Sequence, residues 1–136
     1  MAETLELEIV TPERLVIHER VEEVQIPGLS GYLGVLPGHA PLITELGVGE
    51  ITFRSGGTTT RLAVAWGFAE VLANKVTILA ESCERAGEID VARAQQAKQR
   101  AEETLRGQAP DINYDDEQGA LKHAETRIEV AGKKEQ

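Results

Sequence analysis

Hydrophobic and polar side chains alternate with a period of two over roughly the first 84 residues. The hydrophobic positions form five short runs, namely Leu5, Leu7 and Ile9; Val24 and Ile26; Ile51 and Phe53; Leu62, Val64 and Trp66; and Val76, Ile78 and Ala80. Turn-forming residues at 11–13, 55–57 and 73–75 separate several of these runs. Because successive side chains of a strand point to opposite faces, this pattern predicts the short strands of an antiparallel β-sandwich.

The pattern changes to a helical one at Asp90. Residues 90–106 contain no glycine or proline and are rich in helix formers, and Asp90 is a suitable N-cap. A second helical run covers roughly 114–131, and a connection of only a few residues makes the two helices antiparallel. The predicted fold class is therefore β + α, with an N-terminal antiparallel β-sandwich in residues 1–86 and a C-terminal antiparallel two-helix hairpin in residues 87–136.

Both predicted helices carry a narrow apolar seam that is rich in alanine. The seams are Ala94, Ala97, Ala101 and Leu105 on the first helix, and Leu121, Ala124, Ile128 and Ala131 on the second. Alanine seams bury little surface, at about 0.8 kcal/mol per CH₂-sized group against ordering costs of about 1–2 kcal/mol per residue. Two interpretations stay open: a subdomain that is permanently docked on the sandwich, or a hairpin that leaves it when a ligand or partner binds.

The overall composition excludes several classes of protein. With 14 Lys and Arg against 23 Asp and Glu, the net charge is −9, which argues against a nucleic-acid-binding protein. The single cysteine, Cys83, excludes an intramolecular disulfide and is expected to be a small buried hydrophobe near a strand end. The start of the chain resembles neither a secretory signal nor a transit peptide, and no apolar run approaches the ~20 residues of a membrane helix. We therefore expect a soluble protein of a reducing compartment, without direct membrane insertion.

Motifs for catalysis, for metal binding and for a required cofactor are missing from the sequence. His18, His39 and His123 are scattered over both halves without ligand-like spacing. No HExxH, CxxC or Walker-type motif is present. We therefore predict no catalytic residue and no metal ligand, and we do not expect an enzyme.

The segment GYLGVLPGHAP at 31–41 is interpreted as a shaped loop. Gly31 and Gly34 allow a positive φ or close backbone approach, and Pro37-Gly38 is a turn signal. His39 is expected to hydrogen-bond backbone groups inside the loop. The segment lacks the Lys-Ser/Thr of a phosphate-binding loop, so a structural role is a better interpretation than a phosphate, metal or catalytic site.

The start of the first predicted helix carries an unusual cation. Arg93 occupies the third helical position, where the helix dipole disfavours positive charge, and Arg100 lies on the same face. Two arginines near free backbone N–H groups attract an anion. The alternative is ion pairing with Glu84, Glu88 or Asp90, and the sequence leaves both interpretations open.

Four motifs together resemble one known family. They are GYLGVLPGHAPL at 31–42, WGFAEV at 66–71, KVTILAE at 75–81 and IDVARA at 89–94. With the order of sandwich and alanine-rich hairpin, they make the chain similar, over essentially its whole length, to the epsilon subunit of bacterial F-type rotary ATP synthases.

This resemblance implies a non-catalytic subunit of the central stalk, peripheral to the cytoplasmic face of the bacterial plasma membrane. In the family, the sandwich binds the gamma subunit and rests on the c-ring, so that proton translocation is coupled to ATP synthesis. The c-ring contact corresponds here to Gly31, Tyr32, Gly34 and His39. Many relatives carry an acidic residue in place of Tyr32, which implies a less electrostatic contact in this chain.

The resemblance also implies a regulatory role for the hairpin. In relatives it either folds against the sandwich or extends along gamma, where it reaches the alpha and beta subunits and inhibits ATP hydrolysis. The basic residues that correspond to the beta-subunit contact are Lys122, His123, Arg127, Lys133 and Lys134.

Some bacterial relatives bind ATP in the folded hairpin through the motif I/L-D-x-x-R-A. The matching residues here are Glu84, Ile89, Asp90, Arg93, Ala94, Arg100 and Arg127, whereas His123 replaces an arginine. A neutral histidine supplies less charge to a triphosphate. The implied ligand is regulatory ATP, and the alternative function is a stand-alone nucleotide-sensing module that stays monomeric with ATP instead of co-purifying with gamma.

Overall fold

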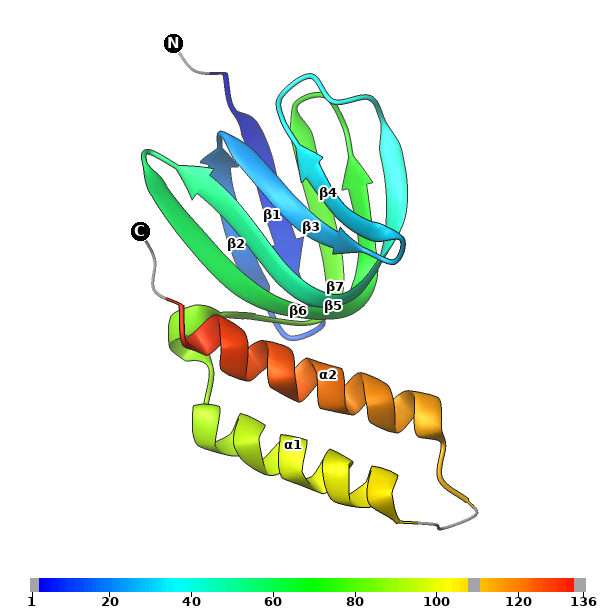
Figure 1. Cartoon of the computed structure of the whole chain (residues 1–136). Coiled ribbons are helices and arrows are strands. Elements are labelled where there is room, and N and C mark those ends of the chain that lie inside the picture. The colour runs from blue at the N-terminus through cyan, green and yellow to red at the C-terminus, as the bar shows by residue number, and fades with distance from the viewer. Residues whose placement is uncertain (1–2, 108–110, 134–136) are drawn as a thin grey trace.

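The computed structural model of the chain describes residues 3–107 and 111–133. In chain order the elements are β1 (Leu5–Val10), β2 (Leu15–Val21), β3 (Glu23–Gly28), β4 (Gly31–Val35), β5 (Leu42–Ser55), β6 (Thr58–Val71), β7 (Lys75–Arg85), the short 3₁₀ helix η1 (Ala86–Glu88), α1 (Val91–Arg106) and α2 (Tyr114–Ala131). The strands form a two-layered β-sandwich, and the two helices lie against one end of it (Figure 1). The predicted β + α fold class is confirmed.

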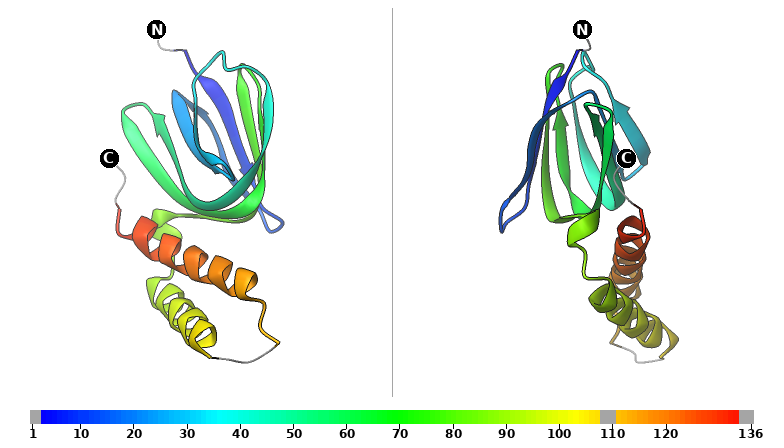
Figure 2. Two further views of the ribbon diagram at one scale, coloured as in Figure 1. Left: turned by 45° about the vertical axis from the view of Figure 1, so that its right-hand side comes forward. Right: turned by 90° about the vertical axis from the view of Figure 1, so that its left-hand side faces the viewer.

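The strands hydrogen-bond in the order β2-β1-β7-β6-β5-β3-β4, and all neighbours are antiparallel except β1 and β7. The 14-residue strands β5 and β6 curve across the molecule, so that one continuous sheet folds into two layers (Figure 2). The largest fully buried side chains, which fill the space between the layers, are Phe53, Leu5, Leu7, Ile9, Ile17, Ile26, Leu46, Ile51, Leu62, Ile78, Val21 and Val24. The alternating runs of the sequence therefore supply most of the sandwich core.

The interpretation of residues 31–41 as a loop is wrong for its first half. Residues Gly31–Val35 form strand β4, which pairs with β3, and only residues 36–41 connect it to β5. Val35 is buried and Leu33 packs against the core, but glycines at positions 31 and 34 hide the period of two. Strand β2 was also missed, because Val16 and Ile17 are both buried next to a register shift and so break the alternation.

Trp66 departs from the predicted alternation. The sequence pattern groups Trp66 with the inward-facing Leu62 and Val64, but its φ of 57° and the φ of 140° at Gly67 reverse the alternation of β6. Ala69 is then buried, whereas Trp66 is 38% exposed. A Cβ at Gly67 would lie 2.1 Å from the Leu79 carbonyl oxygen, so only glycine fits at this kink.

The helix boundaries agree with the sequence to within a residue. The side chain of Asp90 caps α1 by accepting a hydrogen bond from the Arg93 N–H (3.1 Å), and Asn113 caps α2 through the Asp116 N–H (3.1 Å). Of the two seams, Ala94, Ala101 and Ala124 are buried and the other members are half-buried. Neither helix of the described residues has the length and hydrophobicity required to cross a bilayer.

Helix α2 lies between the sandwich and α1. It contacts β5, β6 and η1 on one side and packs along α1 on the other (Figures 1 and 2). Because α1 touches the rest of the molecule mainly through α2, the docking of the hairpin depends on what α2 presents to the strands.

Candidate functional site

The interface between α2 and the sandwich has a small apolar centre. Its buried members are Ala63 of β6, Ile89 between η1 and α1, and Val130 of α2, which are 1%, 8% and 1% exposed. Ala86 and Ala131 pack at its edge. The centre is separate from the sandwich core, so it contributes to hairpin docking rather than to the stability of the sandwich.

Two ion pairs flank this apolar centre. Arg127 of α2 donates from Nε and Nη2 to the two carboxylate oxygens of Glu84 on β7, at 2.7 and 3.2 Å. Lys133 donates from Nζ to Glu50 of β5 at 3.1 Å, and this bond raises the pKa of the lysine. Arg61 of β6 also pairs with Glu50, at 2.9 Å. The Arg127–Glu84 side chains are only 15% and 26% exposed, so this bidentate pair is the stronger electrostatic link.

An aromatic contact completes the interface. The Trp66 ring lies edge-on to the ring of His123 of α2, with centroids 5.9 Å apart and planes at 71°. One helical turn earlier, a Cβ on Gly119 would lie 3.0 Å from Cζ2 of Trp66. The absence of a side chain at Gly119 therefore gives the indole room to approach α2.

His123 is unusual among the polar groups at this interface. Its Nε2 is buried without a hydrogen-bond partner in the part of the chain that the structure describes. Burial lowers the pKa of His123, the nearby Arg127 lowers it further, and Glu84 acts in the opposite direction. His123 is therefore neutral at neutral pH and supplies no positive charge to this interface.

The residues predicted to bind ATP lie in three places. Glu84, His123 and Arg127 meet at the interface, and there Glu84 and Arg127 already satisfy each other. Ile89, Asp90, Arg93 and Ala94 surround the start of α1, where Ile89 and Ala94 are buried and Asp90 acts as the N-cap; Arg100 lies two turns further along α1. The arrangement offers cationic side chains in each of these places.

Within the described residues, Arg93 and Arg100 of α1 do not form the ion pairs that the sequence left open as an alternative. Glu84 pairs with Arg127, Glu88 pairs with Arg14 at 3.0 Å, and the Asp90 side chain caps the helix. Arg93 and Arg100 are exposed, and neither forms an ion pair with any residue between 3 and 107 or between 111 and 133. Both guanidinium groups are therefore available to an anion.

The predicted c-ring residues lie at opposite ends of β4. Gly31 and Tyr32 begin the strand next to α2, and the Tyr32 hydroxyl accepts a hydrogen bond from the Glu50 N–H (2.9 Å). His39 lies in the connection 36–41, where its Nδ1 contacts the neighbouring Ala40 carbonyl oxygen (2.7 Å), as expected for a residue that organises the loop. Gly31 has a φ of 134°, whereas Gly34 needs no such conformation. The structure thus separates Tyr32 from His39.

Most of the residues predicted to contact the beta subunit lie on helix α2. Lys122 is exposed, whereas His123, Arg127 and Lys133 face the sandwich in the contacts described above; Lys134 lies outside the described residues. A cavity of about 280 Å³ opens between α2 and β5, and its polar lining includes Tyr32, Glu50, Lys122 and Lys133. In the docked hairpin, two of the predicted contact cations are therefore engaged by the chain itself.

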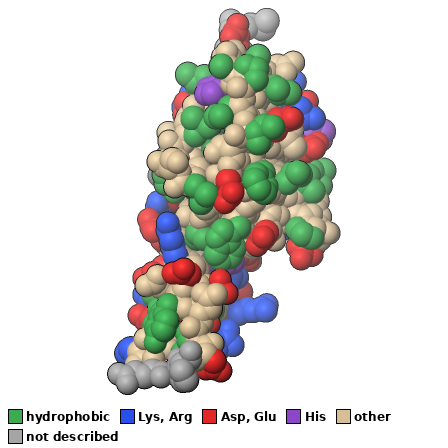
Figure 3. Space-filling model, turned by 90° about the vertical axis from the view of Figure 1, so that its right-hand side faces the viewer, with side chains coloured by type: hydrophobic (Ala, Val, Ile, Leu, Met, Phe, Trp, Pro, Cys, Tyr) green, Lys and Arg blue, Asp and Glu red, His purple; other side chains and the backbone are tan. Residues whose placement is uncertain are grey.

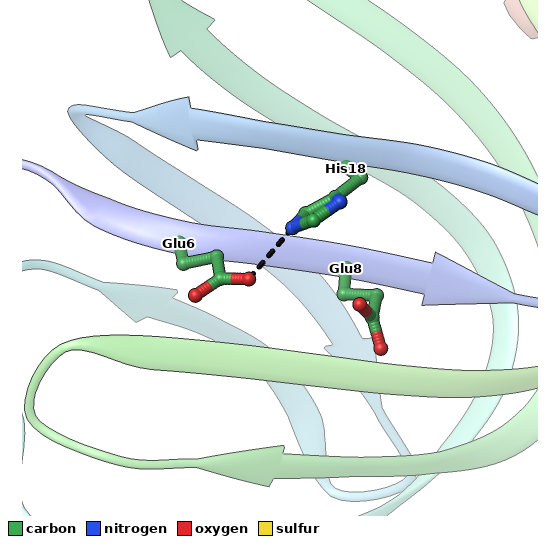
Figure 4. Close-up of side chains that lie close together, drawn as sticks. All are labelled: Glu6, Glu8 and His18. Atoms are coloured by element: carbon green, nitrogen blue, oxygen red, sulfur yellow. Dashed lines mark hydrogen bonds and ion pairs between the residues drawn. The ribbon is translucent and has the colours of Figure 1, made fainter.

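The structure also brings together three residues that the sequence left apart. Glu6 and Glu8 of β1 lie beside His18 of β2, and one potential ligand atom from each lies within 4.8 Å of the others (Figure 4). His18 Nε2 contacts Glu6 Oε2 at 2.7 Å, which lowers the pKa of Glu6, and Lys75 is 3.9 Å away. The strand register, which places His18 opposite Glu8, was not readable from the spacing. An exposed ion pair accounts for this arrangement.

Hydrophobic side chains are gathered on one face of the sandwich (Figure 3). The most exposed large hydrophobic residues on β5, β6 and β7 include Ile43, Phe68 and Leu79, which are 72%, 55% and 57% exposed. Phe68 is paired directly with Leu79 in the sheet, and both line a shallow hollow. Such a cluster is typical of a protein–protein interface.

Comparison with protein families accounts for nearly the whole chain. Residues 4–86 match the model of the beta-sandwich domain of the ATP synthase delta/epsilon chain, and residues 88–132 match its long alpha-helix domain. The ATP synthase epsilon chain of Koribacter versatilis is 63% identical over 82% of this chain and 78% of its own length. That of Geobacter metallireducens is 47% identical over 98% of this chain and 97% of its own length.

Solved structures share the fold. A chain of the Euglena gracilis mitochondrial ATP synthase superposes with a TM-score of 0.80 at 23% identity, covering 94% of this chain and 81% of the other. A chain from the central stalk and c-ring structure of the Tetrahymena thermophila mitochondrial ATP synthase gives a TM-score of 0.58 at 14% identity, covering 95% of this chain and 94% of the other.

Proposed function

This chain belongs to the ATP synthase delta/epsilon family as an epsilon chain, and we propose that it is a non-catalytic rotor subunit of a bacterial F-type ATP synthase. In this role it helps to couple proton translocation through the c-ring to ATP synthesis, as a peripheral protein on the cytoplasmic face of the membrane. The observation that carries the proposal is the match of both domains, in order, to epsilon chains of bacteria.

The exposed apolar face of the sandwich supports docking to the gamma subunit. Ile43, Phe68 and Leu79 lie on neighbouring strands and keep more than half of their surface in contact with water. A protein partner that covers this face removes about 25 cal/mol of unfavourable hydration per Å². Gamma is the partner that the family implies.

Co-purification with gamma tests this assignment. We expect Phe68→Asp to reduce recovery of the gamma complex by at least about tenfold, because a buried unpaired charge is costly. Tyr114→Asp is the matched control, because Tyr114 is a comparably exposed aromatic residue on the hairpin. Equal recovery of both variants would place the gamma contact elsewhere on the chain.

We assign the c-ring contact to the ends of strand β4. Gly31 and Tyr32 lie at one end, and His39 lies in the connection beyond the other, with Gly34 between them. Since these positions are well separated, cysteine cross-linking from Tyr32→Cys and from His39→Cys tests them independently. The position that yields a c-ring adduct identifies which end of the sandwich faces the membrane.

We further propose that the hairpin inhibits ATP hydrolysis when it extends toward the alpha and beta subunits. Arg127 and Lys133 support this role, because in the docked hairpin they are occupied by Glu84 and Glu50. Undocking frees both cations at once, together with the already exposed Lys122. The docked state thus hides part of the basic surface that the extended state presents.

ATPase activity of the assembled enzyme tests the inhibition. Deletion of residues 88–136 is expected to raise hydrolysis, since it removes the cations while keeping the sandwich that holds the subunit in the complex. Equal activity with and without the hairpin rejects the inhibitory role. Recovery of the complex in equal yield is the control that separates loss of inhibition from loss of assembly.

Regulatory ATP is the ligand that we propose for the docked hairpin. The exposed guanidinium groups of Arg93 and Arg100 support an anion, and an anion near Arg93 also gains from the positive end of the α1 dipole. Because His123 is neutral and Arg127 is held by Glu84, we expect binding in the millimolar range, about −4 kcal/mol.

Calorimetric titration of the full chain with ATP tests nucleotide binding. Arg93→Gln and Arg100→Gln are expected to abolish the heat, whereas Arg106→Gln is the matched control, because Arg106 is an exposed arginine in the last turn of the same helix. Absence of heat at millimolar ATP in the parent chain rejects the nucleotide site and with it the alternative of a stand-alone nucleotide-sensing module.

A further inference from the structure

We infer that protonation of His123 releases the hairpin from the sandwich, so that acidification shifts the subunit from its docked to its open state. This inference rests on the proposed regulatory role of the hairpin and adds the signal that controls it. It depends on the one histidine that lies between the two parts of the molecule.

The surroundings of His123 favour a neutral ring. Trp66 of β6 contacts the imidazole in an edge-on arrangement, and the buried Nε2 finds no hydrogen-bond partner among the described residues. A neutral imidazole has one N–H and one acceptor nitrogen, so the buried neutral ring lacks only the one hydrogen bond of Nε2. An imidazolium has two N–H donors and a full charge, and burying it without a partner is far more costly.

The charged groups around His123 do not provide a free partner. Arg127, one turn along α2, repels a second cation, and Glu84 of β7 is occupied by Arg127 through both of its oxygens. Three further acidic groups of the surrounding elements are paired elsewhere: Glu50 of β5 with Arg61 and Lys133, Glu88 of η1 with Arg14, and Glu125 of α2 with Lys98. The exposed cations Lys122 of α2 and Arg93 and Arg100 of α1 cannot pair with an imidazolium. Protonated His123 therefore gains no ion pair in the docked state.

The direction of the pH effect follows from this difference. In the open hairpin His123 is surrounded by water and has its ordinary pKa of about 6.5, whereas in the docked state its pKa is lower. The open state therefore binds the proton more readily. The docked state therefore has its full stability above about pH 6.5. As the pH falls below this value, the docked-to-open ratio decreases by at most about tenfold per pH unit.

The docking interface is small enough for one proton to matter. Its apolar centre has three buried side chains, and its ion pairs lie at the edge of the interface. His18 and His39, by contrast, lie on β2 and in the connection 36–41, away from α2. Only one of the three histidines of the chain therefore lies where a charge opposes docking.

Two measurements on the full-length chain test the inference. NMR titration of the histidine ring protons, assigned with single His→Gln variants, gives the pKa of His123 directly. Spin labels at Thr58→Cys and Gln99→Cys, both exposed positions, report the distance between sandwich and hairpin. The buried Cys83 thiol, whose pKa burial raises to about 12, stays unlabelled.

We expect the His123 pKa to lie below that of the same residue in Gly119→Leu, in which Trp66 cannot seat against α2. The open-to-docked ratio should rise at least about threefold between about pH 7.5 and about pH 5.5. His123→Gln should remove this response, and His39→Gln should retain it. Equal pKa values in the two chains, or an unchanged response in His123→Gln, would overturn the inference.

These measurements are independent of the proposed inhibition. If the chain opens with acid but deletion of the hairpin leaves ATPase activity unchanged, the regulatory function fails and the proton-driven release stands. If the hairpin inhibits but its docking is independent of His123, the reverse holds.

Discussion

The sandwich and the hairpin are held by different kinds of contact. The sandwich has a continuous core to which all seven strands contribute, with Leu5, Ile51 and Ile78 fully buried. The hairpin docks through a three-residue apolar centre, one aromatic contact and two ion pairs. A large core gives a sandwich of fixed shape, whereas a small mixed interface requires less free energy to separate.

The largest effect on stability is expected from a substitution in the sandwich core. Phe53→Ala removes a fully enclosed ring from the sandwich core and should lower the free energy of unfolding by about 3–5 kcal/mol. Val130→Ala, which truncates a buried side chain at the docking interface, should leave the sandwich transition in place. Urea denaturation followed by far-UV circular dichroism measures both, and equal losses would contradict two separate cores.

A smaller effect is expected from overpacking the docking interface. Gly119→Leu puts a side chain where even a Cβ lies 3.0 Å from Trp66, which should weaken docking by about 1–3 kcal/mol. Trp66 is the only tryptophan, so its emission should shift to the red as the indole is exposed. Gln118→Leu, at the exposed neighbouring position, is the control and should leave the spectrum unchanged.

The Arg127–Glu84 pair allows a half-buried ion pair to be compared with an exposed one. Arg127→Ala leaves a carboxylate without its bidentate partner and should weaken docking by about 1–2 kcal/mol. The more exposed Arg14–Glu88 pair serves for comparison, and Arg14→Ala should have no measurable effect. A double-mutant cycle for each pair, read by hydrogen exchange of the α2 amides, gives the coupling energies; similar values would contradict the distinction.

The smallest expected effect concerns Cys83, which lies in the sandwich core. The residue is 4% exposed and burial raises the pKa of its thiol to about 12, so alkylation at about pH 8 should be very slow in the folded chain. Undocking the hairpin with Gly119→Leu should not change this rate, whereas unfolding with guanidinium should restore full reactivity. Faster alkylation in Gly119→Leu would mean that the hairpin protects the sandwich as well.

The sequence predicted the elements whose side chains follow a single period. The runs around Leu7, Ile51 and Ile78 alternate and are buried, and the two helices begin one residue after their caps. It failed where the backbone departs from that period. Glycines conceal β4, and the positive φ at Trp66 turns an apparently inward residue toward the hairpin.

The candidate site was predictable only in parts. Local signals identified the N-cap at Asp90 and the unusual cation at Arg93, but they left open whether Arg93 forms an ion pair. The link between Arg127 and Glu84 joins residues far apart in the chain, and the contact of Trp66 with Gly119 and His123 depends on how α2 is laid across β6. Such contacts arise from tertiary packing, which periodicity and caps do not encode.

The short turn η1 determines the geometry of any hairpin movement. Glu88 accepts a hydrogen bond from the Arg85 N–H and pairs with Arg14 of the β1–β2 connection, so the chain is held against the sandwich up to that residue. The pivot therefore lies at Ile89 and Asp90, and Ile89 is the one buried side chain that must be withdrawn there. From this pivot, α1 and α2 placed end to end form a lever of about 50 Å at ~1.5 Å per residue. If the hairpin undocks at this pivot, the far end of α2 can therefore reach several tens of ångströms, roughly 50 Å, from Ile89.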